Sequence, residues 1–489
     1  MTDETFIDRE RAFRGVGTMV LMTIVFFVLA GAMSYLVYFR SLEGANVWDF
    51  VAFLALIAMP CVIFDVYLWS SERSLLAEKR KIAAMYTVMT VSLALEFCFA
   101  SVISSDYGIY CAPFAVCALV IALLINPRCS FYANFTVLLI FFINEMRFSG
   151  DATRMYFSLF AGIATGILAS SWISRCTRRI QYIVTAVKLG LFSLLIGASV
   201  SILFVNVGAI PDGMLQICLF SLLSGAIDIA LFMLLVPTFE WLFNLVSDFR
   251  LAEIASANRP LMKRLRRDAI GTFNHSLLLA NYAEACAAAI GEDVFLARAA
   301  GYYHDIGKLA APKFFSENQM GGENPHDSLS PEASVRIIKT HVTKGIALAK
   351  EYRLPIEIQK VIAEHHGTLP IMFFYHKANR ITEGGEVDMT SYSYDGPKPS
   401  SRISAIIMIC DACEAALRAN NDKSRANEIV EKLVRQRFEQ GQFTDCDVTM
   451  KQLDIIKETI VTTYIGIEHD RVKYPEQNAV KKDRTDNKD

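Results

Sequence analysis

The first half of the chain is dominated by apolar stretches long enough to cross a lipid bilayer. Eight of them precede residue 245, and most approach the ~20 residues that a helix needs to span the hydrocarbon core. They cover residues 16–39, 50–69, 82–104, 107–125, 131–146, 157–173, 188–210 and 215–236. After residue 245 the composition becomes that of a soluble domain. The sequence therefore predicts two parts, a polytopic transmembrane helix bundle and a C-terminal domain.

Positively charged residues occur mainly in alternate short loops between these stretches. The charged loops lie before the first stretch and after the second, fourth and sixth; their basic residues are Arg9, Arg11, Arg14, Arg73, Lys79, Arg80, Lys81, Arg128, Arg175, Arg178 and Arg179. The other short loops contain only Arg40, Arg147 and Arg154. Because cytoplasmic loops are enriched in Lys and Arg, the pattern predicts eight spans in the inner (plasma) membrane. Residues 1–15 and the C-terminal half would then face the cytoplasm.

The first apolar stretch has a second interpretation. Ala30-Gly31-Ala32 resembles the small-residue cleavage site of a signal peptide, although the apolar run is long for one. Removal of this helix would leave the other spans, and the cytoplasmic location of the C-terminal half, in place.

Three acidic residues, Asp65, Glu96 and Asp228, interrupt the apolar stretches. A carboxylate at membrane depth is costly and usually faces the interior of a bundle or a cavity. These residues therefore indicate either a ligand-sensing or ion-responsive pocket, or structural hydrogen bonds between helices. The structural interpretation is favoured because nothing else marks a transport path.

The C-terminal half is predicted to be almost entirely helical. Apolar residues recur at helical spacing, for example in residues 274–290, 331–352, 355–366 and 402–419. Ser330 before Pro331 is typical of a helix start, and Gly367 of a helix end. Residues 370–400 lack this periodicity and are predicted to form a loop or a short hairpin. Residues 471–489 are charged and poor in apolar residues, which predicts a disordered tail.

All eight histidines lie in the second half, at positions 275, 304, 326, 341, 365, 366, 376 and 469. Histidine serves as a metal ligand and as a general acid or base, so this segregation places the chemistry there. The net charge of −2 argues against a nucleic-acid-binding surface. The one Cys-x-x-Cys, Cys410 to Cys413, lies in an apolar helical pattern without a partner pair and is interpreted as structural.

Several ionisable residues of this half fall within apolar helical patterns. Asp411 lies in the apolar run 406–413, and His365 and His366 lie one turn beyond a buried helical stripe. Each alone is more often a satisfied core residue, but several in one domain suggest a metal centre, since buried charges need a partner. The candidate ligands are His275, His304, Asp305, His341, His365, His366 and Asp411. Mixed imidazole and carboxylate ligation suits Fe, Mn, Zn or Co rather than Ca.

The residues around these candidates resemble a known family. His304-Asp305-Ile306-Gly307-Lys308 resembles the signature of HD-domain phosphohydrolases, and His275 upstream and Asp411 downstream complete its pattern. The wider context resembles the seven-transmembrane HD family of PgpH type, whose members hydrolyse cyclic di-AMP. The segments that carry this likeness are 271–276, Glu317-Asn318-Gln319, Asn324-Pro325-His326-Asp327, His365-His366-Gly367-Thr368 and Gly396-Pro397-Lys398-Pro399. The resemblance implies an all-helical HD domain over residues 271–470, joined to the transmembrane domain, 16–244, by a linker helix, 245–270.

The resemblance also implies a site with two divalent transition metals, most consistent with Mn or Fe. One would be bound by His275, His304, Asp305 and Asp411, and the other by His341, His365 and His366, with Asp305 bridging. Two cations ~3.5–4 Å apart can hold a hydroxide between them and bind the phosphoryl oxygens. Asp305 and Lys308 are the predicted catalytic residues, Lys308 by neutralising charge on the phosphate. Lys308, Asn318 and His326 are predicted to contact substrate, with a solvated Lys308 and a structural His326 as alternatives.

The predicted function is that of a membrane-bound phosphodiesterase that opens cyclic di-AMP to linear pApA. Alternatives are an HD hydrolase of cyclic di-GMP or of a mononucleotide, and a receptor that binds a nucleotide without turnover. No Gly-Tyr-Pro follows the His365-His366 pair, which counts against cyclic di-GMP. The sequence departs from the family at Asn274, where histidine is frequent, and in lacking a large extracytoplasmic domain. The expected partners are the cyclic dinucleotide and the bilayer, without DNA or RNA, and a homodimer is left open.

Overall fold

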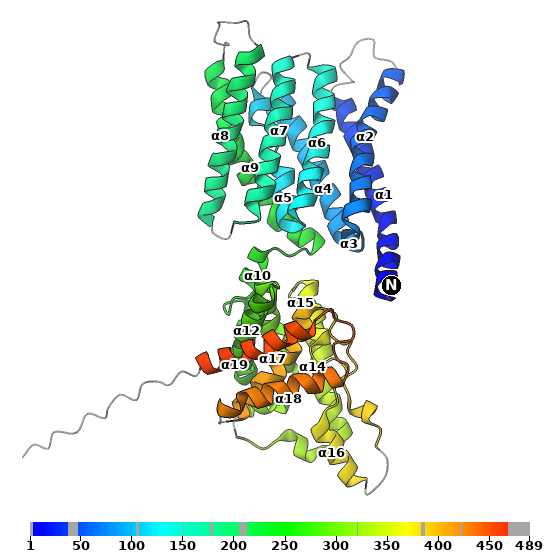
Figure 1. Ribbon diagram of the computed structural model, residues 1–489, viewed down its shortest axis with the longest axis vertical. Coiled ribbons are helices and arrows are strands. Elements are labelled where there is room, and N and C mark those ends of the chain that lie inside the picture. Colours follow the sequence, from blue (N-terminus) through cyan, green and yellow to red (C-terminus); the bar gives the residue numbers. More distant parts are fainter. Residues whose placement is uncertain are drawn as a thin grey trace, which may run out of the picture. The chain divides into compact units, whose positions relative to one another are not determined.

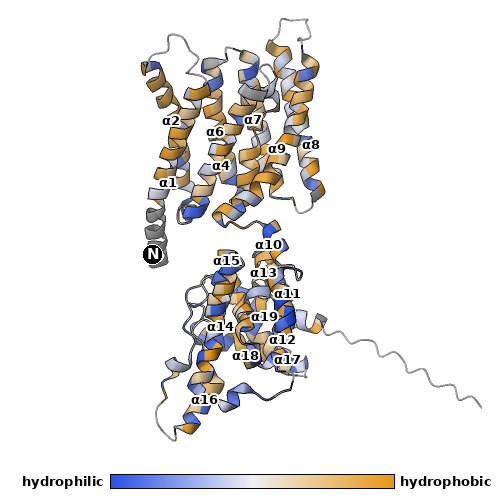
Figure 2. Cartoon of the chain, turned by 180° about the vertical axis from the view of Figure 1, so that it is seen from behind, coloured by the Kyte–Doolittle hydropathy of each residue, from blue (hydrophilic) through white to orange (hydrophobic). Residues whose placement is uncertain are grey.

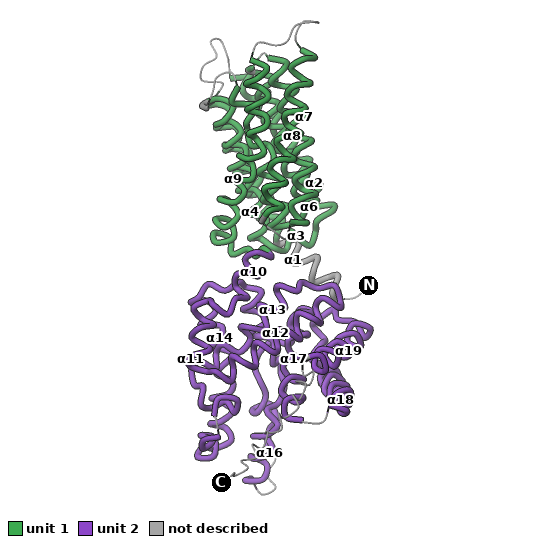
Figure 3. Tube along the Cα trace, turned by 90° about the vertical axis from the view of Figure 1, so that its left-hand side faces the viewer, with its two compact units in different colours: residues 1–247 green, residues 248–489 purple. Residues whose placement is uncertain are grey.

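The structure is a computed structural model in which the chain forms two compact units, residues 1–247 and 248–489 (Figure 3). It describes residues 3–37, 47–103, 107–149, 151–176, 179–204, 213–319, 321–382, 387–420 and 423–467. The predicted tail, 471–489, lies outside the described residues, as do Arg40, Arg178 and His469. Within the described ranges every regular element is a helix, which confirms the all-helical fold class.

Unit 1 is a bundle of long apolar helices (Figures 1 and 2). Its α-helices are α1 (Asp3–Val37), α2 (Val47–Ser71), α3 (Arg73–Leu76), α4 (Lys79–Cys98), α5 (Val116–Leu124), α6 (Pro127–Phe148), α7 (Ala152–Ile173), α8 (Arg179–Phe204) and α9 (Met214–Phe243). A π-helical turn, η2 (Phe99–Ile103), extends α4, and a 3-10 turn, η3 (Gly108–Cys111), precedes α5. Among the described residues, seven helices are long and apolar enough to cross a membrane. Unit 1 thus has the composition of a multi-pass membrane domain.

The predicted fourth span, 107–125, is not a continuous helix, and this corrects the expectation of eight regular spans. Turn η3 and helix α5 are separated by Ala112–Ala115, which contains Pro113. Ala112 has extended dihedral angles, φ −61° and ψ 140°. Proline disfavours a helical conformation in the residue before it, so the helix breaks there.

The broken segment nevertheless runs from one end of the bundle to the other (Figure 1). At its start the Tyr107 ring stacks 6.0 Å from Phe220, near the beginning of α9. At its finish Asn126 donates a hydrogen bond to Glu72, beside α3.

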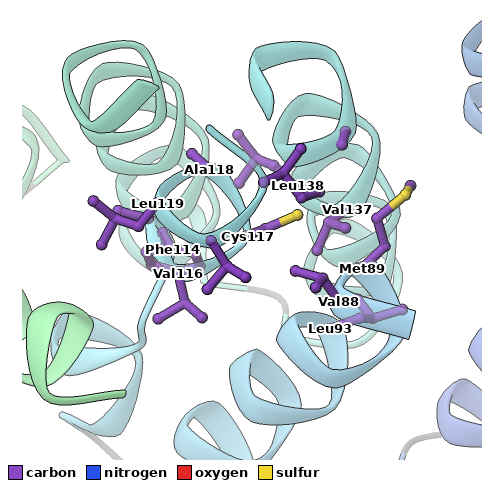
Figure 4. Close-up of a cluster of buried hydrophobic side chains, with 14 of the residues drawn as sticks. Val88, Met89, Leu93, Phe114, Val116, Cys117, Ala118, Leu119, Val137 and Leu138 are labelled. Atoms are coloured by element: carbon purple, nitrogen blue, oxygen red, sulfur yellow. The ribbon is translucent and has the colours of Figure 1, made fainter. Parts of the chain in front are cut away.

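Helix α5 is buried on all sides, as expected for a helix that is apolar all round. Its side chains pack against residues of α4 and α6, among them Met89 and Leu138 (Figure 4). Non-helical backbone at membrane depth is tolerated where protein covers it and its polar groups have partners. Here Asp228 of α9 accepts a hydrogen bond from the backbone N–H of Ala115, 3.1 Å away, at the start of α5.

Unit 2 is a second helical bundle. Its α-helices are α10 (Asp248–Ile254), α11 (Pro260–Asp268), α12 (Ile270–Ile290), α13 (Val294–Tyr303), α14 (Pro331–Glu351), α15 (Ile356–Glu364), α16 (Met372–Ile381), α17 (Arg402–Ala419), α18 (Ala426–Glu439) and α19 (Met450–Ile467). Short 3-10 turns are η4 (Ile306–Ala310), η5 (Pro312–Phe314), η6 (Ser316–Asn318), η7 (Pro325–Ser328), η8 (Met389–Tyr392) and η9 (Lys423–Arg425). Its core joins α12, α17, α18 and α19 around side chains such as Leu279, Ile406 and Ile456.

Two local expectations for unit 2 were wrong. The predicted linker helix, 245–270, contains two helices, α10 and α11, because Arg259 is extended before Pro260. The predicted loop or hairpin, 370–400, contains α16, which buries Phe374 and Ala378 at helical spacing in a small separate cluster. The helix start at Ser330 was predicted correctly, since its side chain accepts a hydrogen bond from Ala333 N.

Candidate metal centre

Five helices of unit 2 bring the seven predicted metal ligands together. His275 lies on α12 and His341 on α14. Two motifs follow the ends of helices: His304-Asp305 begins at the C-cap of α13, and His365-His366 at the C-cap of α15. The seventh, Asp411, lies on α17. The ligands therefore come from segments that are 136 residues apart at the extremes, from 275 to 411.

The glycine of the His-Asp-Ile-Gly-Lys motif explains how two of these segments approach. A β-carbon on Gly307 would lie 1.7 Å from the backbone oxygen of His341 and 2.5 Å from Gly345 N. No side chain fits in that space, so turn η4 packs directly on the backbone of α14. This close contact holds Asp305 next to His341.

The ligand atoms form two groups that share one carboxylate. The first group comprises His275, His304, Asp305 and Asp411, and the second comprises Asp305, His341, His365 and His366. Within each group the ligand atoms all lie within 4.8 Å of one another. Five of the seven residues are buried, and His366 and Asp411 are partly exposed at the rim. The site therefore has a closed floor and an accessible side.

Asp305 faces both groups through different oxygens. Its Oδ2 lies 3.3 Å from His304 Nε2, whereas its Oδ1 lies 3.5 Å from His341 Nε2 and 3.6 Å from His365 Nε2. In the first group, His275 Nε2 lies 3.1 Å from Asp411 Oδ1 and 3.3 Å from His304 Nε2. Asp305 thus lies between the two groups and directs one oxygen to each.

Backbone carbonyls orient three of the histidines. The Nδ1 atoms of His304, His341 and His365 lie 2.8, 2.6 and 2.9 Å from the carbonyl oxygens of the residues three positions earlier. A carbonyl can only accept, so each Nδ1 carries the hydrogen. In its neutral form, each ring then presents the lone pair of Nε2 to the centre.

The second group has the ligand atoms expected of a cation site. His341 Nε2 and His365 Nε2 face each other at 3.4 Å, and both present lone pairs. Asp305 Oδ1, which both approach, is buried and has no hydrogen-bond partner among the described residues. Three hydrogen-bond acceptors thus converge without a hydrogen-bond donor between them. A bound cation would stabilise this arrangement. The mixture of imidazole and carboxylate fits Mn, Fe, Zn or Co.

Electrostatics keep the carboxylates of the site ionised. Burial opposes ionisation, but Lys308 and the neighbouring His304 hold the pKa of Asp305 well below its usual range. The pKa of Asp411 is likewise lowered, against burial, by His275. Burial lowers the pKa of His341 to about 4, so its ring is neutral at neutral pH. Both carboxylates and this imidazole are therefore in the protonation states that bind metals.

Lys308 is a partly buried part of the site, with 14% of its side chain exposed, and not a solvated surface lysine. Its Nζ donates to Asp305 Oδ2 at 2.6 Å and to Glu317 Oε1 at 2.8 Å. Although burial disfavours the charged form, these carboxylates raise the pKa of Lys308 above its ordinary value. Glu317 also accepts a hydrogen bond from Thr272 Oγ1, which links Lys308 to the first turn of α12. The lysine is a fixed cation beside Asp305.

The other two predicted substrate contacts have local hydrogen bonds. Asn318 accepts from Thr272 N and donates to Thr272 Oγ1, so its amide joins η6 to α12. His326 is buried, its Nε2 lies 2.9 Å from the carbonyl oxygen of Phe314, and its ring packs against Phe374. These contacts are with neighbouring residues of unit 2, and the predicted substrate contacts of Asn318 and His326 stay predictions.

Two residues that the sequence did not single out contact the ligands. Tyr394 stacks on His366 with ring centroids 4.2 Å apart. Glu414 is buried, and its Oε2 lies 2.5 Å from His275 Nδ1. The sequence does contain a signal for Glu414, because this residue is a second carboxylate one turn after Asp411 in the same apolar helix. None existed for Tyr394, which lies in the irregular segment after η8.

Comparisons with known proteins agree with this architecture. Residues 47–247 match the family described as a 7TM receptor with intracellular HD hydrolase, and residues 272–416 match the HD domain. The chain belongs to the seven-transmembrane HD family. Together the two matched ranges cover more than two thirds of the chain.

Individual relatives carry the name of a phosphodiesterase. Cyclic-di-AMP phosphodiesterase PgpH of Bacillus subtilis (strain 168) is 31% identical over 444 residues, 89% of this chain and 61% of that protein. The protein of the same name from Listeria monocytogenes serotype 1/2a (strain 10403S) is 35% identical over 368 residues, 74% of this chain and 50% of that protein. This chain is also similar to the one in a crystal structure of the L. monocytogenes PgpH HD domain in complex with cyclic-di-AMP. The two are 42% identical in sequence, the match covers 43% of this chain and 99% of the crystallised chain, and the TM-score is 0.42. The chain thus spans about half to three fifths of the length of these curated relatives.

Proposed function

We propose that unit 2 is a metal-dependent phosphodiesterase that hydrolyses cyclic di-AMP to linear pApA. The observation that carries this proposal is the pair of ligand groups that share Asp305. The names of the two PgpH relatives support cyclic di-AMP as the substrate. The proposed cofactors are two divalent transition metals, Mn or Fe, one in each group.

The residues of the chain have separate roles in this proposal. When bound, two such cations would supply an activated water and neutralise the phosphoryl oxygens during in-line displacement. Asp305 holds the two ligand groups together. Lys308 places a fixed positive charge beside them, where it stabilises the additional negative charge of the transition state. His366 and Asp411, at the exposed rim, lie on the side from which a substrate can enter.

The test uses the purified full chain in lipid nanodiscs, loaded with Mn(II) or Fe(II) and given cyclic di-AMP. We expect linear pApA, detected by chromatography, and none after Asp305→Ala. Asp327→Ala, which changes the exposed aspartate of the other His-Asp pair, is the matched control and should retain activity. Absence of product from the parent chain, or full activity of Asp305→Ala, would reject the proposal. Parallel assays with cyclic di-GMP and mononucleotides rank the substrates.

We also propose that unit 2 lies on the cytoplasmic side of the plasma membrane. Arg80, at the start of α4, donates to the carbonyl oxygen of Asn244 just after α9, so this charged loop and the exit from the membrane domain share one end of unit 1. Arg73, Lys79 and Lys81 belong to the same loop. Basic loops are retained in the cytoplasm. Green fluorescent protein fused to the C-terminus should therefore fluoresce, and alkaline phosphatase fused there should be inactive. The opposite pair of results would show that unit 2 lies on the other side of the membrane.

A further inference from the structure

One ligand histidine is oriented differently from its neighbours. His304, His341 and His365 each direct Nδ1 to a backbone carbonyl, whereas His275 directs Nδ1 to the side chain of Glu414. The Nδ1 to Oε2 distance is 2.5 Å. A backbone carbonyl cannot be removed by substitution, but Glu414 can. The contact is thus both distinct and testable.

The carboxylate of Glu414 has few interactions other than its contact with His275. Its side chain is 2% exposed and lies on α17, one turn after Asp411. Its second oxygen, Oε1, lies 3.5 Å from the half-exposed guanidinium of Arg418 and has no hydrogen-bond partner among the described residues. Burial of a carboxylate is costly unless it is paired, and the shortest contact of this one is the His275 ring. The same helix therefore supplies one ligand, Asp411, and the partner of another.

The chemical consequence follows from the two nitrogens of imidazole. A neutral ring carries one hydrogen, and a carboxylate next to Nδ1 keeps that hydrogen on Nδ1. The lone pair of Nε2 then faces Asp411 and His304, at the first ligand group. A carboxylate is a stronger acceptor than a carbonyl, so it also makes Nε2 a better electron donor to a metal. His275 and Glu414 form a carboxylate–histidine pair directed at one metal.

We propose that Glu414 is a positioning residue for the metal bound by His275, His304, Asp305 and Asp411, and that it does not act on the second group. The second group has its own backbone acceptors, at Ile338 and Ile362. Loss of Glu414 should therefore weaken one metal of the two. This inference rests on the part of the proposed function that assigns a metal to each group, and it is independent of the substrate.

The experiment measures Mn(II) binding to the full chain in nanodiscs, by equilibrium dialysis and by electron paramagnetic resonance. The variants are Glu414→Gln, which keeps the shape and removes the charge, and Glu414→Ala, which leaves Nδ1 without an acceptor. His275→Ala and His341→Ala serve as references for loss of the first and second group. Glu292→Gln is the matched control, because it removes a carboxylate that pairs with Arg402 at the other end of α17 and contacts no ligand.

We expect two bound Mn(II) ions in the parent chain and in Glu292→Gln. Loss of an outer-shell partner typically costs ~10–100-fold in metal affinity, so Glu414→Ala should weaken one ion by about that factor and leave the other unchanged. Glu414→Gln should lie between the parent and Glu414→Ala. The spectrum should change from that of a coupled Mn(II) pair to that of a single ion, as in His275→Ala. The retained second ion shows that the domain remains folded.

Double variants assign the effect to one group. Glu414→Ala should add little to His275→Ala, because both act on the same metal, and should add fully to His341→Ala, so that this double variant binds neither ion tightly. Equal weakening of both ions, unchanged binding in Glu414→Ala, or full additivity with His275→Ala would overturn the inference. A parent chain that binds fewer than two ions would instead reject the two-metal part of the proposed function.

Discussion

The two units of this protein both bury carboxylates, but they arrange them differently. In unit 1 the acids lie on separate helices, and two of them have local partners: Asp65 accepts from Thr23 and Tyr86, and Asp228 accepts from Ala115 N. These contacts agree with the structural interpretation for Asp65 and Asp228, whereas the buried Oε2 of Glu96 has no hydrogen-bond partner among the described residues. In unit 2, Asp305 and Asp411 converge with five imidazoles on one place.

The difference teaches how a buried charge can be interpreted. A single carboxylate that accepts hydrogen bonds from its surroundings is fully explained by them. Acceptors that face one another without a donor, as at Asp305, His341 and His365, are not. Convergence of acceptors therefore indicates chemistry in unit 2 more strongly than burial alone does in unit 1.

The largest effect is expected from breaking the convergence itself. His341→Ala removes a ligand of the second group, so hydrolysis of cyclic di-AMP should fall to the level of the metal-free protein. His376→Ala, a change at an exposed histidine of the same unit, should leave hydrolysis and metal content unchanged. Metal content is measured by mass spectrometry. Equal activities of the two variants would remove the distinction between the converging and the isolated histidines.

A smaller loss is expected when the fixed cation is removed and the ligands are kept. Lys308→Met should lower kcat by roughly 100- to 1,000-fold, the usual cost of losing one group that stabilises transition-state charge. Both metals should stay bound, since Lys308 is not a ligand. Lys313→Met, at an exposed lysine of the next turn, is the control and should behave as the parent. Loss of metal in Lys308→Met would show that the lysine supports the ligands instead.

Acidity should weaken the first metal more than the second. Burial opposes a charged ring, but hydrogen bonds to Asp411 and Glu414 raise the pKa of metal-free His275 to about 10. A metal must then displace one proton below pH 10, so its affinity should rise about tenfold per pH unit. His341, with a pKa of about 4, is already neutral above that pH. Mn(II) titrations between pH 6 and 9 should therefore show one pH-dependent ion, and two ions with the same pH dependence would contradict this assignment.

The smallest effect on the metal centre is expected from the membrane acids. Asp228→Ala leaves the N–H of Ala115 without its partner at the start of α5, which costs about 1–3 kcal/mol for a buried donor. Thermal unfolding in detergent should occur at a lower temperature, while the metal content of unit 2 stays the same. Ser171→Ala, at an exposed hydroxyl on α7, is the control. Unchanged stability together with altered hydrolysis would assign Asp228 a signalling role instead.

The sequence by itself determined the large-scale organisation of this protein. The length of an apolar stretch decides whether a helix can cross a bilayer, so seven of the eight predicted spans correspond to long helices. The residue types of the metal centre could be proposed from the His-Asp motif and its neighbours. Only the predicted fourth span, 107–125, differs in kind, because Pro113 breaks it and α4, α6 and α9 supply the surroundings that a broken segment requires.

Tertiary structure decided how those residues work together. The approach of Asp305 to His341 depends on the packing of Gly307 against α14, which no spacing in the sequence reveals. The same holds for the local hydrogen bonds of Asn318 and His326, and for the contact between Glu414 and His275. The physical reason is one of range: helix formation and membrane insertion follow from local composition, whereas ligand geometry depends on atoms brought within about 3 Å from distant parts of the chain.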